Sequence, residues 1–294
     1  MASPELEAVA QSMFAARGAP PRPLEEARAG ADGFSANFPP PDGMDARPAE
    51  AGGVPGEWVT APGSGDDRTI VYLHGGGYVM GSVASHRGAA ARIAAASGAR
   101  AFSVEYPLAP EHPHPAALDA TLSVWQGLLD DGVDPRSVVF AGDSAGGGLA
   151  IAAAMRARDE GRSLPAALVL ISPWVDLTCS GESMLTNAET DPLISPALRE
   201  RVDQYAPGFD PKEPYLSPLF GDHAGLPPTL IQVAATECLL DDSRRLADAM
   251  SAAGVDATME VWPDALHAWH IFAPVIPESL AAIDAVGEFV RAKI

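Results

Sequence analysis

Residues 138–150 read VVFAGDSAGGGLA, and this stretch decides the fold. The apolar run at 138–141 predicts a buried strand, and the alanine-rich stretch after Ser144 predicts a helix that begins at once. Gly142 and Gly146 flank the serine and let neighbouring backbone pass closely, because they carry no Cβ. The stretch therefore predicts a strand, a sharp turn and a helix, with Ser144 at the bend as a candidate nucleophile.

Backbone N–H groups are expected on two sides of this serine. The N–H of Ala145, at the start of the helix, can point at an oxyanion that forms next to Ser144. Upstream, a predicted strand at 70–73 ends in His-Gly-Gly-Gly at 74–77, where N–H groups can turn inward around a negative charge. A phosphate-binding loop is the alternative, but no Gly-Lys-Ser/Thr follows and neither lysine is near. Together the two motifs indicate acyl transfer through a serine.

Outward from these motifs, the chain alternates short β-branched runs with alanine-rich stretches. This alternation is typical of an α/β fold, in which helices cover both faces of a mostly parallel sheet. We expect strands at 70–73, 101–106, 138–141, 167–171, 229–235 and 258–262, and helices at 84–97, 116–131, 145–160, 242–253 and 277–293. Prolines and scattered charges interrupt this alternation at 179–228, and the interruption fits either a lid or an ordinary surface loop.

The N-terminal part has a different character. Ser3 is expected to cap a helix that Gly18 ends, and a second short helix is expected at 23–30. The stretch from there to residue 65 is rich in proline and glycine and has few periodic residues. We interpret it as a connector that leads into the core.

Composition excludes several classes of function. The chain has 294 residues, of which 47% are apolar and 20% charged, and this is typical of a globular protein. Its net charge of −20 repels nucleic acid and anionic membrane surfaces, so neither is an expected partner. Two cysteines without CxxC spacing indicate neither a disulfide framework nor a metal site. Without a signal-like or membrane-spanning segment, we expect a soluble, cytoplasmic protein.

A serine hydroxyl needs a general base near neutral pH, and histidine is the usual choice. In the chain order of α/β-hydrolases the histidine comes last, after the acid, which leaves His267 and His270. Both stay open as the base on this ground alone; if His267 is the base, His270 is a structural neighbour. The other histidines show no metal-ligand spacing and are interpreted as loop or packing residues, among them His86, His112 and His114.

The acid that orients the histidine is expected at the carboxyl end of a strand, where crevices open in α/β sheets. Glu237 follows the predicted strand at 229–235 and can orient an imidazole as an aspartate does, with one more methylene of reach. Asp241 or Asp242 could instead cap the next helix. The carboxylates that compete with Glu237 for the role are Asp176, Asp241, Asp242 and Asp264.

Six motifs in order resemble one known family. They are HGGGYVMGS at 74–82, EYPLAPEHPHPAALDA at 105–120, GDSAGGGLA at 142–150, SPWVDL at 172–177, ECLLDDS at 237–243 and LHAWH at 266–270. This sequence resembles the hormone-sensitive-lipase-like branch of the α/β-hydrolases, a group of bacterial and archaeal carboxylesterases. The resemblance covers nearly the whole chain.

The resemblance implies roles for individual residues. Ser144 would be the nucleophile and His267 the base, and no metal or organic cofactor would be needed. The oxyanion hole would consist of the N–H groups of Gly76, Gly77 and Ala145. Residues assigned to substrate binding are Gly75, which also shapes the loop, Tyr78 and Asp143. In one place the chain departs from the family: many relatives read DPLxDE with a catalytic aspartate, where this chain has Glu237.

The resemblance also implies a mobile cap. We divide the chain into an N-terminal helical cap segment at 1–50 and a catalytic α/β-hydrolase domain at 51–294, within which 179–222 is a cap insertion. The expected activity is hydrolysis of short-chain carboxylic esters through an acyl-enzyme. An amidase or acyl transferase would use the same groups, and a silent small-molecule-binding protein would share the fold. An exposed edge strand at 258–262 allows a homodimer.

Overall fold

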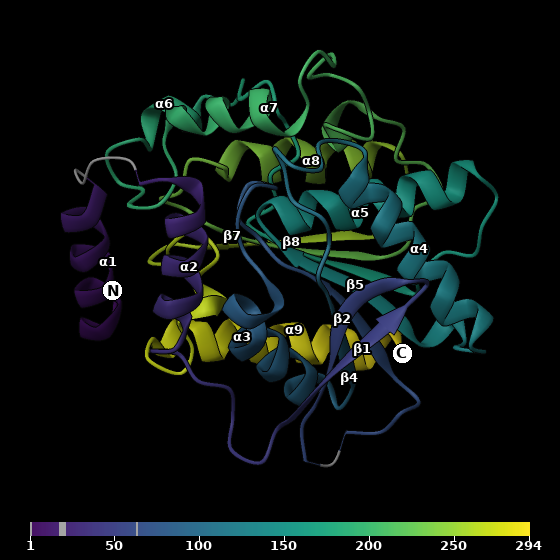
Figure 1. Cartoon of the computed structure of the whole chain (residues 1–294). Coiled ribbons are helices and arrows are strands. Elements are labelled where there is room, and N and C mark those ends of the chain that lie inside the picture. Colours follow the sequence, from purple (N-terminus) through teal and green to yellow (C-terminus); the bar gives the residue numbers. More distant parts are fainter. Residues whose placement is uncertain (1, 18–21, 63) are drawn as a thin grey trace.

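The computed structural model describes residues 2–17, 22–62 and 64–294, which fold around one twisted sheet (Figure 1). Within these residues the sheet has eight strands in the order β1-β2-β4-β3-β5-β6-β7-β8. From β4 to β8 neighbouring strands are parallel, and β1 and β2 are antiparallel to their neighbours. The strands are β1 (Asp45–Ala51), β2 (Val54–Thr60), β3 (Thr69–Leu73), β4 (Arg100–Val104), β5 (Val138–Asp143), β6 (Ala167–Ile171), β7 (Thr229–Ala234) and β8 (Ala257–Trp262).

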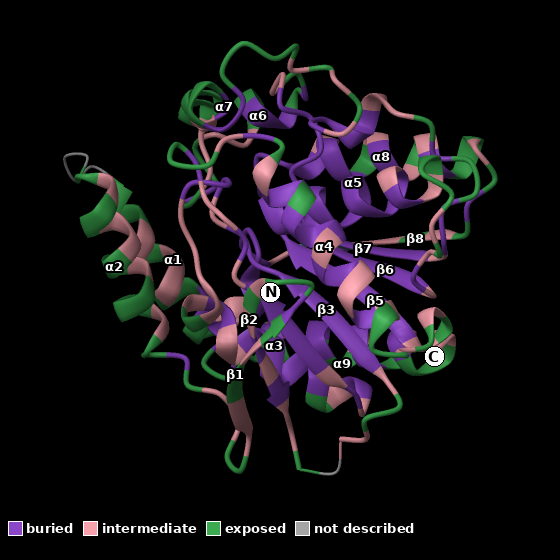
Figure 2. Cartoon of the chain, turned by 45° about the vertical axis from the view of Figure 1, so that its right-hand side comes forward, coloured by how far each residue is buried: buried purple, intermediate pink, exposed green. Residues whose placement is uncertain are grey.

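Helices cover both faces of the sheet, and Figure 2 shows the buried strands between them. Side chains alternate along β3: Val71 and Leu73 pack into one core and Ile70 and Tyr72 into the other. The first core contains residues of α4 (Ala116–Asp130), α5 (Ala145–Asp159) and α8 (Leu240–Ala252), and the second contains residues of α3 (Val83–Ser97) and α9 (Pro277–Lys293). The predicted α/β class, six strands and five helices of the core are confirmed, with boundaries shifted by one or two residues.

The interpretation of the stretch before residue 65 as a connector is wrong. Residues 45–60 form the hairpin β1–β2, whose turn is Gly52-Gly53 with φ of +56° and +76°. Strand β1 lies at the edge of the sheet and carries Asp45, Arg47, Pro48 and Glu50, so it lacks the apolar alternation that predicts a strand. The double glycine at the turn was the available signal. Residues 45–50, which we grouped with the cap, therefore belong to the sheet.

Two helices precede this hairpin. In α1 (Pro4–Arg17) the Ser3 hydroxyl accepts a hydrogen bond of 3.1 Å from the Leu6 N–H, as predicted for a capping serine. The predicted stop at Gly18 lies outside the described residues. Helix α2 (Leu24–Ser35) is longer than expected. Leu6 and Phe38 anchor this part of the chain on Trp269 and Phe272, near the start of α9.

The region between β6 and β7 contains only short helices. They are α6 (Ser183–Thr186), the 3₁₀ helix η2 (Pro196–Leu198), α7 (Arg199–Tyr205) and the 3₁₀ helix η3 (Pro218–Phe220). Figure 1 shows α6 and α7 along the top of the molecule, with α1 and α2 at the left. At the other limit of the sheet β8 is an edge strand, and its pairing with a second copy stays a prediction. Among the described helices, none has the length and apolar character needed to cross a bilayer.

Asp242 gives the fold a pH-dependent stability. Burial, followed by repulsion from Asp176, raises its pKa from the ordinary aspartate range to about 8. A raised carboxyl pKa favours the protonated form in the folded state, so the stabilisation is complete below the unfolded-state pKa and is lost as the pH rises towards 8. Relative to the wild type, Asp242→Asn should gain several degrees in unfolding midpoint between pH 4 and pH 8. Thermal unfolding across this range measures the difference, with the exposed Asp248→Asn as control; parallel curves for Asp242→Asn and wild type would contradict it.

Candidate active site

Ser144 stands at the sharp turn between β5 and α5, with φ of +54° and ψ of −120°. This backbone conformation is strained for a side chain other than glycine and requires close packing to hold it. A Cβ at Gly146 would lie 2.0 Å from the Leu73 carbonyl oxygen, and one at Gly142 would lie 2.4 Å from Gly146, so both positions require glycine. The Ser144 N–H donates to the Ile171 carbonyl at 2.8 Å, which fixes the turn on strand β6.

His267 and Glu237 form a buried pair in the same region. The imidazole Nδ1 lies 3.0 Å from Glu237 Oε1. The other carboxylate oxygen, Oε2, accepts from the Ser172 hydroxyl at 2.7 Å and from the Ala234 N–H at 2.9 Å. The Ser172 hydroxyl oxygen in turn accepts from the Ala268 N–H at 3.0 Å, next to the histidine. With Nδ1 engaged by the carboxylate, Nε2 is the ring nitrogen left to act on a hydroxyl.

Burial lowers the pKa of His267, but the charge and hydrogen bond of Glu237 outweigh this and raise it above 6.5. The carboxylate therefore stabilises the protonated imidazole, as a partner of a general base must do when the base takes up a proton. Both Ser144 and His267 line one cavity. No hydrogen bond joins the two side chains within the described part of the chain, and such contacts commonly tighten only when substrate binds.

Two of the other carboxylates considered for the acid, Asp241 and Asp242, have different partners. Asp242 Oδ2 accepts from the N–H groups of Val175 and Asp176, at 3.0 and 2.9 Å. Asp241 accepts from the Ser183 N–H and pairs with Arg244. Since α8 begins at Leu240, neither aspartate caps it. Glu237 is thus the carboxylate that is hydrogen-bonded to His267 in the structure. His270 bonds Gln232 at 2.7 Å, and burial lowers its pKa to about 3.

The loop after β3 brings two of its glycines to the cavity. Gly76 and Gly77 line it, with φ of +122° and +62° that favour glycine. A Cβ at Gly76 would lie 2.1 Å from the Met80 carbonyl oxygen, so a residue with a side chain does not fit at this position in the present loop conformation. Ala145 begins α5 directly after Ser144, where the first N–H groups of a helix have no partner within it.

The three residues assigned to substrate binding have different positions. Asp143 lines the cavity, but its Oδ1 accepts from the Tyr72 hydroxyl at 2.8 Å and from the Gly75 N–H at 3.1 Å. Gly75 is not on the cavity wall, because its N–H faces that carboxylate. Tyr78 is also absent from the wall: its ring is buried and stacks on Tyr205 at 3.8 Å. The assignment of Gly75 and Tyr78 to substrate contact is therefore not supported by their positions.

The cavity measures about 660 Å³ and is lined by the catalytic groups, by α1 and α2, and by residues of the region between β6 and β7. One wall is apolar and comes mainly from α1, α2 and the segments near Phe38 and Phe272; it includes Met13, Leu24, Ala27, Ala31, Phe34 and Ile271. The region between β6 and β7 contributes a mixed lining, with polar Ser195, Glu200, Arg201 and Gln204 beside apolar Leu193, Ile194, Ala197 and Leu198. An apolar group and a polar group of one small molecule could therefore bind on different parts of the lining.

Comparison with known proteins agrees with this geometry. A family model described as the alpha/beta hydrolase fold matches residues 70–271. An esterase structure from the bacterial hormone-sensitive lipase family superposes with a TM-score of 0.97 at 42% identity, covering 100% of this chain and 99% of that one. The chain belongs to the bacterial hormone-sensitive lipase family of α/β-hydrolases. The sequence-based resemblance is confirmed.

Relatives of this hydrolase family carry names of the same class of activity. An acetyl-hydrolase of Streptomyces hygroscopicus is 42% identical over 99% of this chain and 97% of its own. An esterase of Acinetobacter venetianus is 37% identical over 86% of this chain and 84% of its own. A second structure, a hormone-sensitive lipase from a metagenome library, has a TM-score of 0.95 at 35% identity, covering 98% of both chains. These relatives confirm the prediction of a carboxylic-ester hydrolase.

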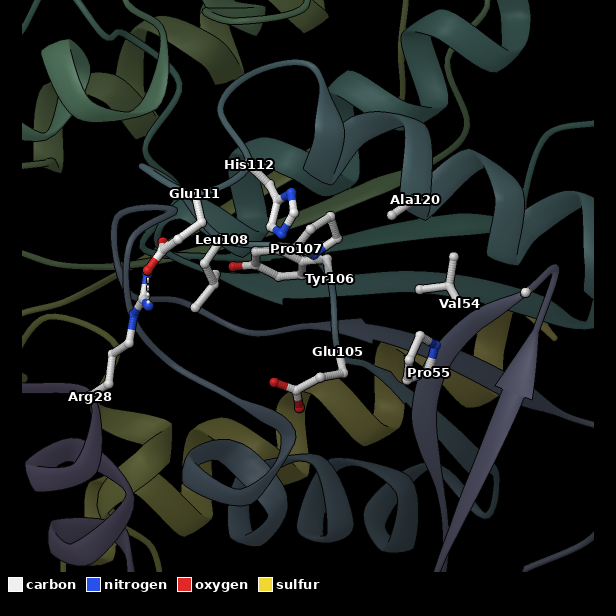
Figure 3. A pocket seen from close by; sticks show the side chains of 11 residues that line it. Arg28, Val54, Pro55, Glu105, Tyr106, Pro107, Leu108, Glu111, His112 and Ala120 are labelled. Atoms are coloured by element: carbon white, nitrogen blue, oxygen red, sulfur yellow. Dashed lines mark hydrogen bonds and ion pairs between the residues drawn. The ribbon is translucent and has the colours of Figure 1, made fainter. Parts of the chain in front are cut away.

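Helix α2 of this hydrolase is also held by an arginine. Arg28 donates to the carbonyls of Val79 and Ala109, each at 2.8 Å, and to both oxygens of Glu111. Figure 3 shows this pair at one end of a hollow that also contains Glu105. The arginine therefore fixes α2, which also lines the catalytic cavity, to the loops that follow β3 and β4.

Sequence analysis missed one residue of the site. His86 lies on α3 and was interpreted as a packing residue, yet it lines the cavity next to Asp143, with its Nε2 3.4 Å from Asp143 Oδ2. Because His86 and Asp143 lie far apart along the chain, this contact cannot be recognised from adjacent residues of the sequence. The signal that could have found it is its place in the first turn of the helix that follows the HGGG loop, which brings it back towards the glycines.

Proposed function

We propose that this protein is a serine carboxylesterase that hydrolyses short-chain esters through an acyl-enzyme. The observation that supports it most is the convergence on one cavity of Ser144, at a strained turn, and His267, held by Glu237. A serine, a base and an oriented carboxylate in this chain order are the parts that acyl transfer needs.

In the acylation step, the Ser144 hydroxyl attacks the ester carbonyl while Nε2 of His267 takes its proton. The carbonyl oxygen becomes an oxyanion, for which the N–H groups of Gly76, Gly77 and Ala145 are the proposed donors. The protonated imidazole then gives its proton to the leaving alcohol, and the acyl group stays on the serine.

In the deacylation step, His267 removes a proton from water, which attacks the acyl carbonyl. A second oxyanion forms in the same place and collapses, releasing the acid and restoring the serine hydroxyl. Glu237 carries no proton through this cycle; it keeps Nδ1–H as the donor and stabilises the imidazolium.

We also propose that α1, α2 and the 179–222 insertion form a cap over the substrate. The cavity supports this, since residues of α1, α2 and the insertion all line it together with Ser144 and His267. The apolar wall with Met13, Phe34 and Phe38 would hold the acyl chain. The free thiols of Cys179 and Cys238 fit a reducing compartment, and we place the protein in the cytoplasm.

A panel of nitrophenyl esters from acetyl to dodecanoyl tests the substrate class. We expect kcat/KM to be greatest among the shortest acyl chains and to fall at least about tenfold for dodecanoyl, since a cavity of about 660 Å³ must also hold the alcohol part. Matched amides and alcohol acceptors run in parallel separate hydrolysis of esters from amidase and transferase activity. Preference for an amide, for transfer to an alcohol or for the longest chain would contradict the proposal.

A further inference from the structure

A second histidine–carboxylate pair lies in the cavity, outside the proposed triad. His86 Nε2 is 3.4 Å from Asp143 Oδ2, and both side chains are buried. Asp143 directly precedes Ser144 in the chain and lines the same cavity. The pair therefore lies next to the proposed nucleophile, on a different element from His267.

Asp143 connects this pair to the glycine loop. Its Oδ1 accepts from the Gly75 N–H at 3.1 Å, and a Cβ at Gly75 would lie only 2.2 Å from its Oδ2. The carboxylate is thus packed against the loop whose next two residues are the proposed oxyanion donors. The Tyr72 hydroxyl, at 2.8 Å, completes its set of donors. Asp143 therefore links His86 to the loop that contains Gly76 and Gly77.

The hydrogen bonds around His86 favour donation from both ring nitrogens. Its Nδ1 lies 2.8 Å from the Ser85 hydroxyl oxygen. That hydroxyl lies 2.9 Å from the Ser82 carbonyl, which can only accept, and it also accepts from the Ser82 N–H at 2.8 Å. A hydroxyl has one proton, so when Ser85 gives it to the carbonyl, Nδ1 must donate. Since Nε2 faces a carboxylate, the ring then carries a positive charge.

The charged groups around the ring favour the same state. Asp143 faces it from the end of β5, Asp32 from α2, where it accepts from the Ser82 hydroxyl, and Glu105 from the segment after β4, where it accepts from the Val83 N–H. Its aromatic neighbours, Tyr72 and His74, have ring centres at 6.5 and 5.5 Å. Burial lowers the pKa of His74 to about 3 and raises that of Tyr72, so both are neutral.

We propose that His86 is a positioning residue: its protonated form holds Asp143, and through it the glycine loop, in the geometry that stabilises the oxyanion. The inference rests on the proposed function. Burial lowers the pKa of His86, but the charge and hydrogen bond of Asp143 outweigh this and raise it above its usual value. When His86 loses its proton the ion pair is lost, and the loop is held only by the remaining hydrogen bonds of Asp143. Activity should then decline on the alkaline side.

The pH profile of kcat tests this role. His86→Gln can still donate to Asp143 but has no charge, so we expect kcat to fall about ten- to a hundredfold, with KM changed much less. We also expect the alkaline decline of the wild type to disappear in this variant. The exposed histidine variant His112→Gln is the control and should keep both kcat and the decline. An unchanged kcat and an unchanged alkaline limb in His86→Gln would overturn the proposal.

Histidine NMR tests the charge directly and needs no catalysis. In Ser144→Ala protein with ¹⁵N-labelled imidazoles, we expect the His86 signal, assigned by its loss in His86→Gln, to be that of an imidazolium at pH 6 and to titrate above the usual histidine pKa. Adding Asp143→Asn should move its titration to lower pH. A neutral His86 at pH 6 in the otherwise intact protein would overturn the inference, whereas failure of the proposed esterase activity would leave this signal unchanged.

Discussion

Ser144→Ala should abolish turnover of a short-chain nitrophenyl ester, with kcat reduced on the order of 10⁴ to 10⁶. Without the hydroxyl no acyl-enzyme forms, and only the oxyanion donors and substrate binding remain to assist direct attack by water. The fold should be unaffected, because the backbone of the turn is held by the Ser144 N–H bond to Ile171 and by the two flanking glycines, none of which involves the hydroxyl.

Two measurements check this expectation. Steady-state kinetics gives the loss, and mass spectrometry after treatment with an organophosphonate should show a covalent adduct on the wild type and none on Ser144→Ala. The exposed Ser251→Ala should behave as wild type in both, and the thermal unfolding midpoints of all three proteins should agree. If Ser144→Ala kept most of its activity, or still accepted the phosphonate at the same rate, another nucleophile would be responsible.

Glu237→Gln should lower kcat on the order of 10³ to 10⁴, as loss of the acid does in other triads. An amide can donate to Nδ1 and so favour the wrong tautomer, with the proton on Nε2, where the base must be free. The pH profile should also move. His267 must be neutral to accept a proton, so activity rises with pH through its pKa, which Glu237 raises. Without that charge the pKa falls, and the acid limb should shift to lower pH.

Asp241→Asn is the matched control for this prediction. It removes one negative charge four positions along, from a carboxylate bonded to Ser183 and paired with Arg244 rather than to the histidine. We expect its kcat to stay within about twofold of the wild-type value. The acid limb of its pH profile should lie at the same pH as in the wild type. The opposite result, a large loss in Asp241→Asn with near-normal Glu237→Gln, would transfer the role of the acid to the aspartate.

The core of the fold could be predicted because its strands are buried on both faces. A buried parallel strand such as β5 is a continuous apolar run, and its neighbouring helix is alanine-rich, so the pattern is visible without contacts. The hairpin β1–β2 could not be found in this way, because an edge strand exposed on part of its surface keeps charged residues and a proline. The local pattern predicts a strand only where burial selects the residues.

The site shows the same limit. Ser144 and the glycine loop carry their geometry in adjacent residues, so they could be recognised along the chain. The choice of Glu237 over Asp241 or Asp242 depends on where each carboxylate points after a strand end, and His86 depends on how α3 folds back over the HGGG loop. Tyr78, adjacent to that loop, turns away to stack on Tyr205. The roles of these residues depend on where each side chain points in the fold, and the residue type alone does not give that direction.

The two oxygens of Glu237 have separate tasks, and this limits how the position can change. One holds the histidine, and the other ties β7 and Ser172 together. A shorter aspartate at 237 cannot span both distances unless the backbone moves, so Glu237→Asp would loosen either the histidine or the link between β7 and Ser172. Such a variant would keep an acid of the right charge, yet it would be impaired in catalysis or in local packing.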